Sequence, residues 1–191
     1  MNEQQAITRM KQGDISGLEV LVREYQLQAV RTAMMVTQDR AIAEDVVQST
    51  FVRIYRKIHQ FEEGRPFGPW FLRSVVNAAV QEMRKRGRHL SLDAEVPWLD
   101  SDVTFEDLLP AKTVGPDDHI EVSELADHVR EALAQLTPDQ RAAVVLRYFL
   151  DMSEREMADE LDIPAGTVKW RLHAARKRLR GLLVEQGVEY G

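Results

Sequence analysis

The sequence predicts an all-α protein made of two small helical domains joined by an acidic flexible linker. Apolar residues recur at spacings of three and four, whereas the alternation typical of strands is scarce. Good helix formers are plentiful, and 191 residues contain only ten glycines and seven prolines. The periodicity fails between Gly87 and Asp118, where proline, glycine and acidic residues accumulate. We therefore expect domains at 1–90 and 119–187, with a linker at 91–118.

Three helices are predicted in the first domain, at about 15–37, 40–58 and 66–86. Asp14 and Asp39 are suited to cap the first two, and Pro66 fits the first turn of the third. The residues expected to face a common core are Leu18, Leu21, Val22, Tyr25, Ala29, Ala43, Val47, Phe51, Ile54, Ile58, Phe67, Phe71, Val75 and either Ala78 or Ala79. Such a set is sufficient to form the hydrophobic core of a domain of about ninety residues.

Four helices are predicted in the second domain, at about 119–136, 138–150, 154–161 and 165–183. Two capping boxes mark helix starts, one from Thr137 to Gln140 and one from Ser153 to Glu156. The short helix at 154–161, the turn at 162–164 and the long basic helix after it are typical of a helix-turn-helix. Such a unit places its second helix in the major groove of DNA.

Charge is distributed unevenly along the chain. The net charge is −6, yet residues 91–131 contain twelve acidic and two basic residues, so the remainder carries +4. Acid-free basic segments lie at 83–89 and 166–183. A helical wheel of the second segment puts Val168, Leu172, Ala175, Leu179 and Leu182 toward the core, and Trp170, His173, Ala174 and Lys177 opposite, flanked by Lys169, Arg171, Arg176 and Arg180. Cations alone would suit a solvated face, but a tryptophan at its centre favours a binding surface.

Several classes of function are disfavoured. The absence of cysteine excludes disulfides, thiolate zinc sites and thiol nucleophiles. The five histidines lack paired ligand spacing, and no phosphate-binding loop or nucleophile elbow is present, so we expect no catalytic residue, metal or cofactor. No run approaches the ~18 apolar residues of a membrane span. The first five residues do not resemble a secretory signal, so we expect a cytoplasmic protein without membrane insertion.

At this point a family resemblance becomes visible. Residues 136–141 (LTPDQR), 146–149 (LRYF) and 166–179 resemble region 4 of the extracytoplasmic-function (ECF, group 4) sigma factors of the sigma-70 family. Residues 43–55 (AEDVVQSTFVRIY) and 66–79 resemble region 2 of the same family. The resemblance covers both helical halves in the family's order. It implies a non-catalytic subunit that binds core RNA polymerase and directs initiation at promoters.

The resemblance also implies roles for individual residues. Region 2 would bind the clamp helices of the largest polymerase subunit through Asp45, Gln48 and Val52, which share one helix face. It would melt and read the −10 element with the loop at 59–65 and with Arg65, Phe67, Trp70, Arg73, Asn77, Arg84, Lys85, Arg86 and Arg88. Periodicity alone leaves it open whether Phe67 and Trp70 stack on bases or belong to the core.

Region 4 would contact the flap of the second-largest polymerase subunit and read the −35 element. The residues implied for −35 are Arg155, Thr167, Lys169, Trp170, Arg171, His173, Ala174, Arg176 and Lys177. Trp170 and Ala174 depart from the serine and arginine of many relatives, and Glu62 and Glu63 leave open which −10 base is captured. Asp162 replaces a frequent turn glycine, but aspartate tolerates the left-handed conformation, so the turn is expected to form.

Three further hypotheses accompany this interpretation. The alternative function is a stand-alone helix-turn-helix regulator, which would protect a palindromic operator without polymerase. An anti-sigma factor could cover both regions, as in many relatives. The acidic linker could fold over the basic helices, in which case neutralising Asp100, Asp102, Glu106 and Asp107 would raise the affinity of the free chain for promoter DNA at low salt.

Overall fold

Every element of regular structure in the described part of the chain is helical. The computed structural model describes residues 1–62, 64–87 and 128–185. The elements are α1 (Glu3–Lys11), α2 (Ser16–Thr37), α3 (Arg40–Lys57), the 3-10 helix η1 (Ile58–Gln60), α4 (Phe67–Gly87), a helical segment at 128–134, α6 (Pro138–Val144), the π-helical η3 (Val145–Phe149), α7 (Glu154–Leu161) and α8 (Ala165–Glu185). The all-α prediction is confirmed, whereas the expectations for the linker fall outside the described residues.

The helix α1 was not predicted. Its N-terminus carries a capping box, in which Asn2 accepts from the Gln5 backbone and Gln5 accepts from the Asn2 backbone. Ala6, Ile7 and Met10 are buried against α2. The two helices approach closely at Gly17, where a Cβ atom would lie 2.2 Å from the Ala6 carbonyl oxygen. A glycine in α2 is therefore required for α1 to dock.

The N-terminal core lies between α2, α3 and α4, as the apolar faces predicted. Asp39 caps α3 by accepting from the Ile42 N–H, and the predicted core positions of α3 and α4 are buried. Phe51, Phe67 and Phe71 pack ring against ring, with centroids 4.4 Å apart for Phe51 and Phe71 and 5.6 Å apart for Phe67 and Phe71. These contacts fix the position of α4 on the bundle.

The C-terminal half contains the predicted helix-turn-helix. Both capping boxes are present, at Thr137–Gln140 and Ser153–Glu156. Asp162 ends α7 in the left-handed conformation, with φ 52° and ψ 51°, so the turn forms as expected. Along α8 the core positions Val168, Leu172, Ala175 and Leu179 are buried as predicted, but the series continues with Leu183, while Leu182 is only partly buried.

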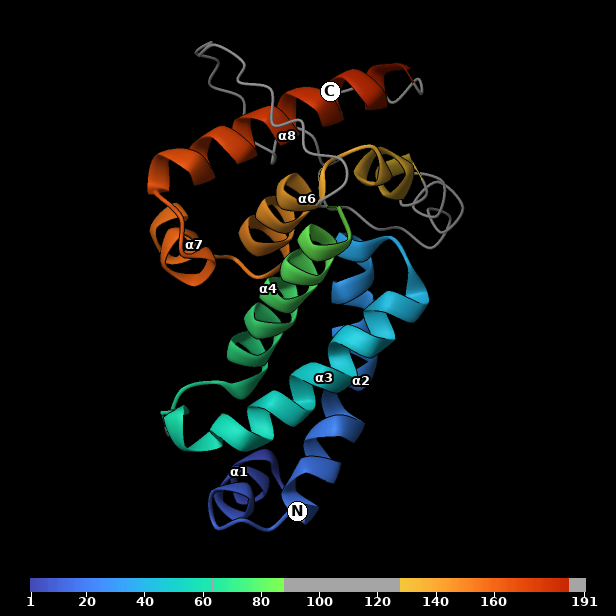
Figure 1. Ribbon diagram of the computed structural model, residues 1–191. Helices are drawn as coiled ribbons and strands as arrows, with labels where there is room; N and C mark the ends of the chain where they lie inside the picture. The colour runs from blue at the N-terminus through green and yellow to red at the C-terminus, as the bar shows by residue number, and fades with distance from the viewer. Residues whose placement is uncertain (63, 88–127, 186–191) are drawn as a thin grey trace, which may run out of the picture.

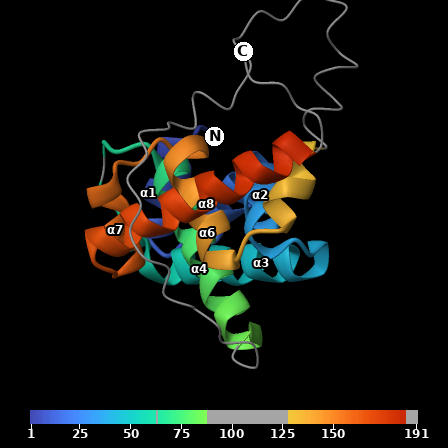
Figure 2. The same ribbon diagram turned by 90° about the horizontal axis from the view of Figure 1, so that it is seen from above.

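The two halves pack directly on each other. Figure 1 shows α4 rising from the N-terminal bundle to meet α6 and α7, with α8 lying across the far side of α6; Figure 2 shows the same arrangement from above. One apolar cluster includes residues of both halves: Val36, Val46, Val76, Ala79 and Val80 with Ala142, Ala143, Val145, Leu146, Met157 and Leu172. The two regions with DNA-binding patterns are thus held against one another.

Arg141 is the buried polar centre of this packing. Its Nε donates to the Val36 carbonyl oxygen at 2.7 Å, and its Nη1 donates to the carbonyl oxygens of Leu136 at 2.6 Å and Ala134 at 3.3 Å. These carbonyls belong to the C-terminal ends of α2 and of the segment 128–134, where a cation is electrostatically favoured. Burial lowers the pKa of the Arg141 guanidinium. One side chain therefore joins helix ends from both halves.

Candidate nucleic-acid interface

The outer face of α8 presents part of the predicted −35 surface. Lys169, Lys177 and, on the preceding helix, Arg155 are exposed. Thr167, Trp170, His173, Ala174 and Arg176 are partly buried. The indole of Trp170 therefore exposes less surface than the wheel suggested, while Lys169 and Lys177 on the same helix are exposed.

Arg171 does not have the environment that the wheel predicted. Only 11% of its side chain is exposed, and its Nη1 lies 3.0 Å from Oδ1 of Asp139 at the start of α6. The wheel treated α8 as an isolated helix and so placed Arg171 on the flank of the exposed face. In the folded chain α6 packs along α8 and covers that flank.

The predicted −10 surface lies along α4, and three of its polar residues contact the C-terminal half. Arg73 lies 3.8 Å from Glu156 of α7, and Asn77 donates to the Glu160 backbone oxygen at 2.8 Å and to Oε1 of Glu160 at 3.3 Å. Arg84 pairs with Asp139 at 2.5 Å. Near these residues, Arg86 and Lys85 lie 2.7 Å and 4.0 Å from Glu82. Arg88 falls outside the described residues.

The aromatic residues of this surface have different environments. Phe67 is fully buried, packed against Tyr25, Phe61 and Phe71, so the prediction that it contacts DNA does not fit this structure. Trp70 is partly buried, and its ring centroid lies 4.9 Å from that of Phe61. Phe67 also packs against Trp70, with ring centroids 5.7 Å apart, and Trp70 is the more exposed of the two. Arg65, in the preceding loop, is exposed and pairs with Glu62 at 2.8 Å.

The predicted polymerase-binding residues share an exposed face of α3. Asp45 and Gln48 are exposed, and Val52 is 48% exposed despite being apolar. Their positions at i, i+3 and i+7 place them on one stripe of the helix. The opposite side of α3 contributes Ala43, Val47, Phe51 and Ile54 to the core, so the stripe faces away from the bundle.

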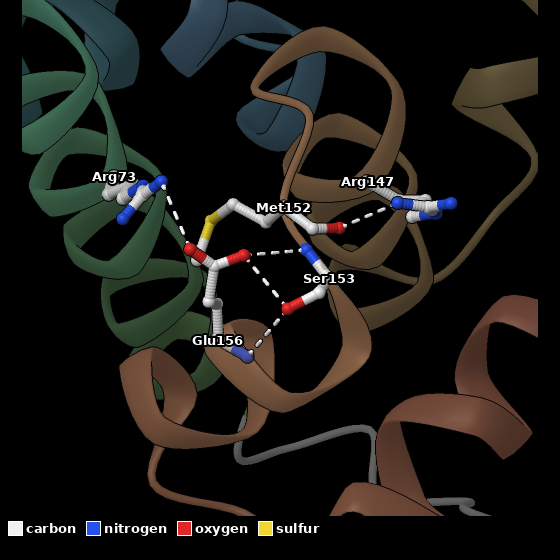
Figure 3. Close-up of polar contacts among 5 residues, drawn as sticks. All are labelled: Arg73, Arg147, Met152, Ser153 and Glu156. Atoms are coloured by element: carbon white, nitrogen blue, oxygen red, sulfur yellow. Dashed lines mark hydrogen bonds and ion pairs between the residues drawn. The ribbon is translucent and has the colours of Figure 1, made fainter.

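The sequence singled out Glu156 only as part of a capping box and Glu160 not at all, yet both carboxylates contact α4. Figure 3 shows Glu156 between Ser153 and Arg73, and Arg147 donating to the Met152 carbonyl oxygen at 3.0 Å. Glu156 Oε2 accepts two hydrogen bonds from Ser153, one from its backbone N–H at 2.9 Å and one from its hydroxyl at 2.8 Å. These hydrogen bonds, with the charge of Arg73, lower the pKa of the Glu156 carboxyl. At Glu160, burial against α4 instead raises the pKa.

The opposite pKa shifts predict opposite pH dependences for two variants of α7. The folded state holds the Glu160 proton more tightly than the unfolded state, so stability from this group is present below about pH 4.5 and is lost as pH rises through the folded pKa. We expect Glu160→Gln to gain thermal stability relative to wild type as pH rises from 4 to 7. Glu156→Gln should lose stability over the same range, because the lowered pKa favours the ionised, folded form. Thermal unfolding midpoints of wild type and both variants, measured at closely spaced pH values, test these predictions. A difference from wild type that does not change with pH would contradict the prediction for that variant.

Other kinds of site are not found among the described residues. No group of three or more histidine, aspartate or glutamate side chains there could hold a metal ion. Within the same ranges, none of the helices has the length and apolarity needed to cross a membrane. What remains as a candidate site is the set of basic and aromatic surfaces on α4 and α8.

Comparison with known proteins connects these surfaces to one family. The model of Sigma-70 region 2 matches residues 21–89, and the model of Sigma-70, region 4, matches residues 127–179. The ECF RNA polymerase sigma factor SigW of Bacillus subtilis is 30% identical over 174 residues, which span 91% of this chain and 92% of SigW. The RNA polymerase sigma-H factor of Pseudomonas aeruginosa is 28% identical over 93% of this chain and 91% of its own.

Solved structures show the same fold. The sigma factor RpoE of Bartonella quintana, crystallised with the anti-sigma factor NepR, aligns with a TM-score of 0.54 at 25% identity, covering 86% of this chain and 97% of RpoE. CnrH in complex with the cytosolic domain of CnrY aligns with a TM-score of 0.55 at 20% identity, covering 96% of this chain and 97% of CnrH. Both halves, their order and nearly the whole length are therefore shared with sigma factors. The chain belongs to the extracytoplasmic-function sigma factors of the sigma-70 family and directs RNA polymerase to promoters.

Proposed function

We propose that this sigma factor is a non-catalytic specificity subunit whose two halves read the −10 and −35 elements. The observation that carries the proposal is the pairing, in one chain, of an α8 helix with exposed cations and an α4 helix bearing Trp70, Arg73 and Asn77. Exposed Lys169 and Lys177 suit phosphates that flank a major-groove site. Trp70 and the exposed Arg65 suit an unpaired base, because stacking on an aromatic ring contributes ~1–3 kcal/mol.

The proposed binding site for the clamp helices of the largest polymerase subunit is the stripe of Asp45, Gln48 and Val52. Val52 supports this assignment, because an exposed apolar side chain between polar neighbours is suited to a protein interface. The flap of the second-largest subunit is the proposed partner of the C-terminal half. An anti-sigma factor is a further proposed partner, since RpoE was crystallised with one. Because the protein would act at promoters, the proposed location is the cytoplasm. The proposed domain bounds are 1–90, 91–118 and 119–187.

Transcription from a fragmented genomic library tests the proposal. Core polymerase with the purified chain should initiate at discrete positions that share −10 and −35 motifs, and core alone should not. Transcript sequencing would also supply the promoter sequence. If the chain alone protected a palindrome and core gave no new start sites, operator binding would replace the proposed function.

A charge-reversal pair tests the polymerase-binding stripe. Asp45→Lys should weaken binding to core polymerase at least tenfold, because it reverses the charge at one end of the stripe. Glu24→Lys makes the same change at an exposed position of α2 and should bind core as wild type does. Affinity is measured by titrating labelled core with each variant. Equal affinities for the two variants would remove Asp45 from the proposed interface.

A further inference from the structure

The helix α1 lies outside every surface assigned so far, since no residue proposed for polymerase or promoter binding precedes Asp45. Its place in the bundle is nevertheless specific. Figure 1 shows α1 below the end of α3, where the chain continues as η1 toward the proposed −10 surface. The helix contacts η1, and Ile7 belongs to the same apolar cluster as Ile58 and Phe61. One face of α1 therefore packs where the proposed −10 surface begins.

The first turn of α1 is joined to α2 by a hydrogen bond. The Tyr25 hydroxyl donates to the Glu3 carboxylate, and both side chains are partly buried. Burial and the hydrogen bond to Glu3 raise the pKa of Tyr25, so its hydroxyl stays protonated and remains a donor. A hydrogen bond to a carboxylate is roughly twice as strong as one between neutral groups. Glu3 therefore fixes the direction of the Tyr25 side chain.

The ring of Tyr25 lies directly on the start of α4. A Cβ at Gly68 would lie 2.8 Å from Cε1 of Tyr25 and 3.3 Å from its hydroxyl oxygen, so the ring rests on the backbone of the first turn. Tyr25 also packs against Phe67 and Phe71, with ring centroids 5.5 Å and 6.1 Å apart. A shift of the Tyr25 ring therefore moves the first turn of α4 or leaves a void beside it.

Two buried rings in turn support Trp70. The ring centroid of Trp70 lies 4.9 Å from that of Phe61 and 5.7 Å from that of Phe67. Phe61 and Phe67 are 3% and 0% exposed, and their own centroids lie 5.7 Å apart. Both supports adjoin groups that α1 contacts, because Phe61 directly follows η1 and Phe67 packs on the Tyr25 ring. The orientation of Trp70 therefore depends on where α1 is docked.

We propose that Glu3 and Tyr25 are positioning residues for the −10 element, and that through them α1 holds Trp70 in the orientation in which an unpaired base stacks. The inference rests on the proposed function, because it takes Trp70 as a −10 contact. Glu3 and Tyr25 act through Phe67 and do not touch DNA. A ring that is ordered before binding loses little rotamer freedom when the base stacks on it. A wrong base already forfeits part of these contacts, so disorder of Trp70 lowers the preference for the right base.

Competition between two promoters tests the role of the hydrogen bond. One promoter carries the −10 motif obtained from the transcript library, and the other differs from it only in the most selective −10 base. Holoenzyme of core polymerase and full-length chain initiates on both in one reaction, and the ratio of the two transcripts is measured. This ratio does not depend on the fraction of chain that is folded, so a loss of stability alone leaves it unchanged. Tyr25→Phe keeps the ring, removes the hydroxyl and should lower the ratio about fivefold.

Tyr55→Phe is the matched control. The Tyr55 hydroxyl donates to the Gly13 carbonyl oxygen at 3.0 Å, so this variant loses a tyrosine hydrogen bond to the turn after α1 instead of one to its first turn. It should keep the wild-type ratio. Glu3→Ala removes the acceptor and should lower the ratio as Tyr25→Phe does. Glu3→Gln retains an acceptor oxygen and should keep most of the preference.

The outcomes separate this inference from the proposed function. A wild-type ratio for either Tyr25→Phe or Glu3→Ala would overturn the positioning role, and so would an equal loss in Tyr25→Phe and Tyr55→Phe. An equal loss in Glu3→Gln and Glu3→Ala would also overturn it, because charge rather than the hydrogen bond would then be responsible. If the wild-type chain does not initiate with core, or initiates without preferring its −10 base, it is the proposed function that fails.

Discussion

Replacing Arg141 by methionine is expected to lower the unfolding free energy by about 3 kcal/mol. The guanidinium is buried and donates to three carbonyl oxygens; hydrogen bonds to charged groups are each worth ~1.5–3 kcal/mol, and the cost of burying the charge offsets part of their sum. Methionine fills similar volume without a donor, so the loss is of hydrogen bonds rather than of packing. For a chain of this length the thermal midpoint should fall by about 6–12 °C.

Arg178 provides the matched control for this variant. It is exposed and donates a 3.0 Å hydrogen bond to the Gln135 carbonyl oxygen, just after the helical segment 128–134 whose end Arg141 also contacts. Arg178→Met should therefore cost less than about 1 kcal/mol. Comparable midpoints for the two variants, measured by scanning calorimetry, would show that the buried guanidinium does not hold the helix ends together.

The second large effect is expected at Gly17. An alanine Cβ there would lie 2.2 Å from the Ala6 carbonyl oxygen and 2.9 Å from Cγ of Met10. The Met10 side chain can move, but the Ala6 oxygen belongs to the backbone of α1, so α1 itself must shift. We expect Gly17→Ala to cost about 2–4 kcal/mol and to expose α1 to proteolysis.

Gly181 distinguishes this steric effect from helix propensity. It lies in α8, and apart from its chain neighbours and the backbone of its own helix no described atom lies within 4 Å of a Cβ placed there. Gly181→Ala should therefore stabilise the chain by up to about 1 kcal/mol, because alanine is the better helix former. Denaturant midpoints of the two variants should move in opposite directions. A shift of the same sign for both would mean that α1 does not pack as described.

Most of the helices could be predicted because local signals and tertiary packing agree. Asp39, Thr137 and Ser153 cap the helices that they were expected to cap, and apolar spacing identified the buried faces of α3, α4 and α8. The helix α1 was not predicted, although its Asn2–Gln5 capping box is readable in the sequence and the still shorter α7 was predicted from a box of the same kind. The π-helical turn at Val145–Phe149 has no comparable sequence signature.

The candidate site was harder to predict, because its environment comes from distant parts of the chain. A helical wheel assigns Arg171 to one side of α8 but cannot show that Asp139 lies there. Periodicity likewise could not separate Phe67 from Trp70; packing by Tyr25 and Phe71 buries the first and leaves the second partly open. The stripe of Asp45, Gln48 and Val52 was correctly expected to be exposed, because a single helix determines it.

The contact between Asn77 and Glu160 has an evolutionary consequence. The shorter of its two hydrogen bonds, at 2.8 Å, ends on the Glu160 backbone oxygen, one of the C-terminal carbonyls that α7 itself cannot satisfy. Every amino acid supplies that oxygen, so position 160 can drift without removing the bond. Position 77 has no such freedom, because the donor belongs to the asparagine side chain. The backbone hydrogen bond therefore constrains the residue at position 77 and not the identity of residue 160, whose side chain adds only the longer contact at 3.3 Å.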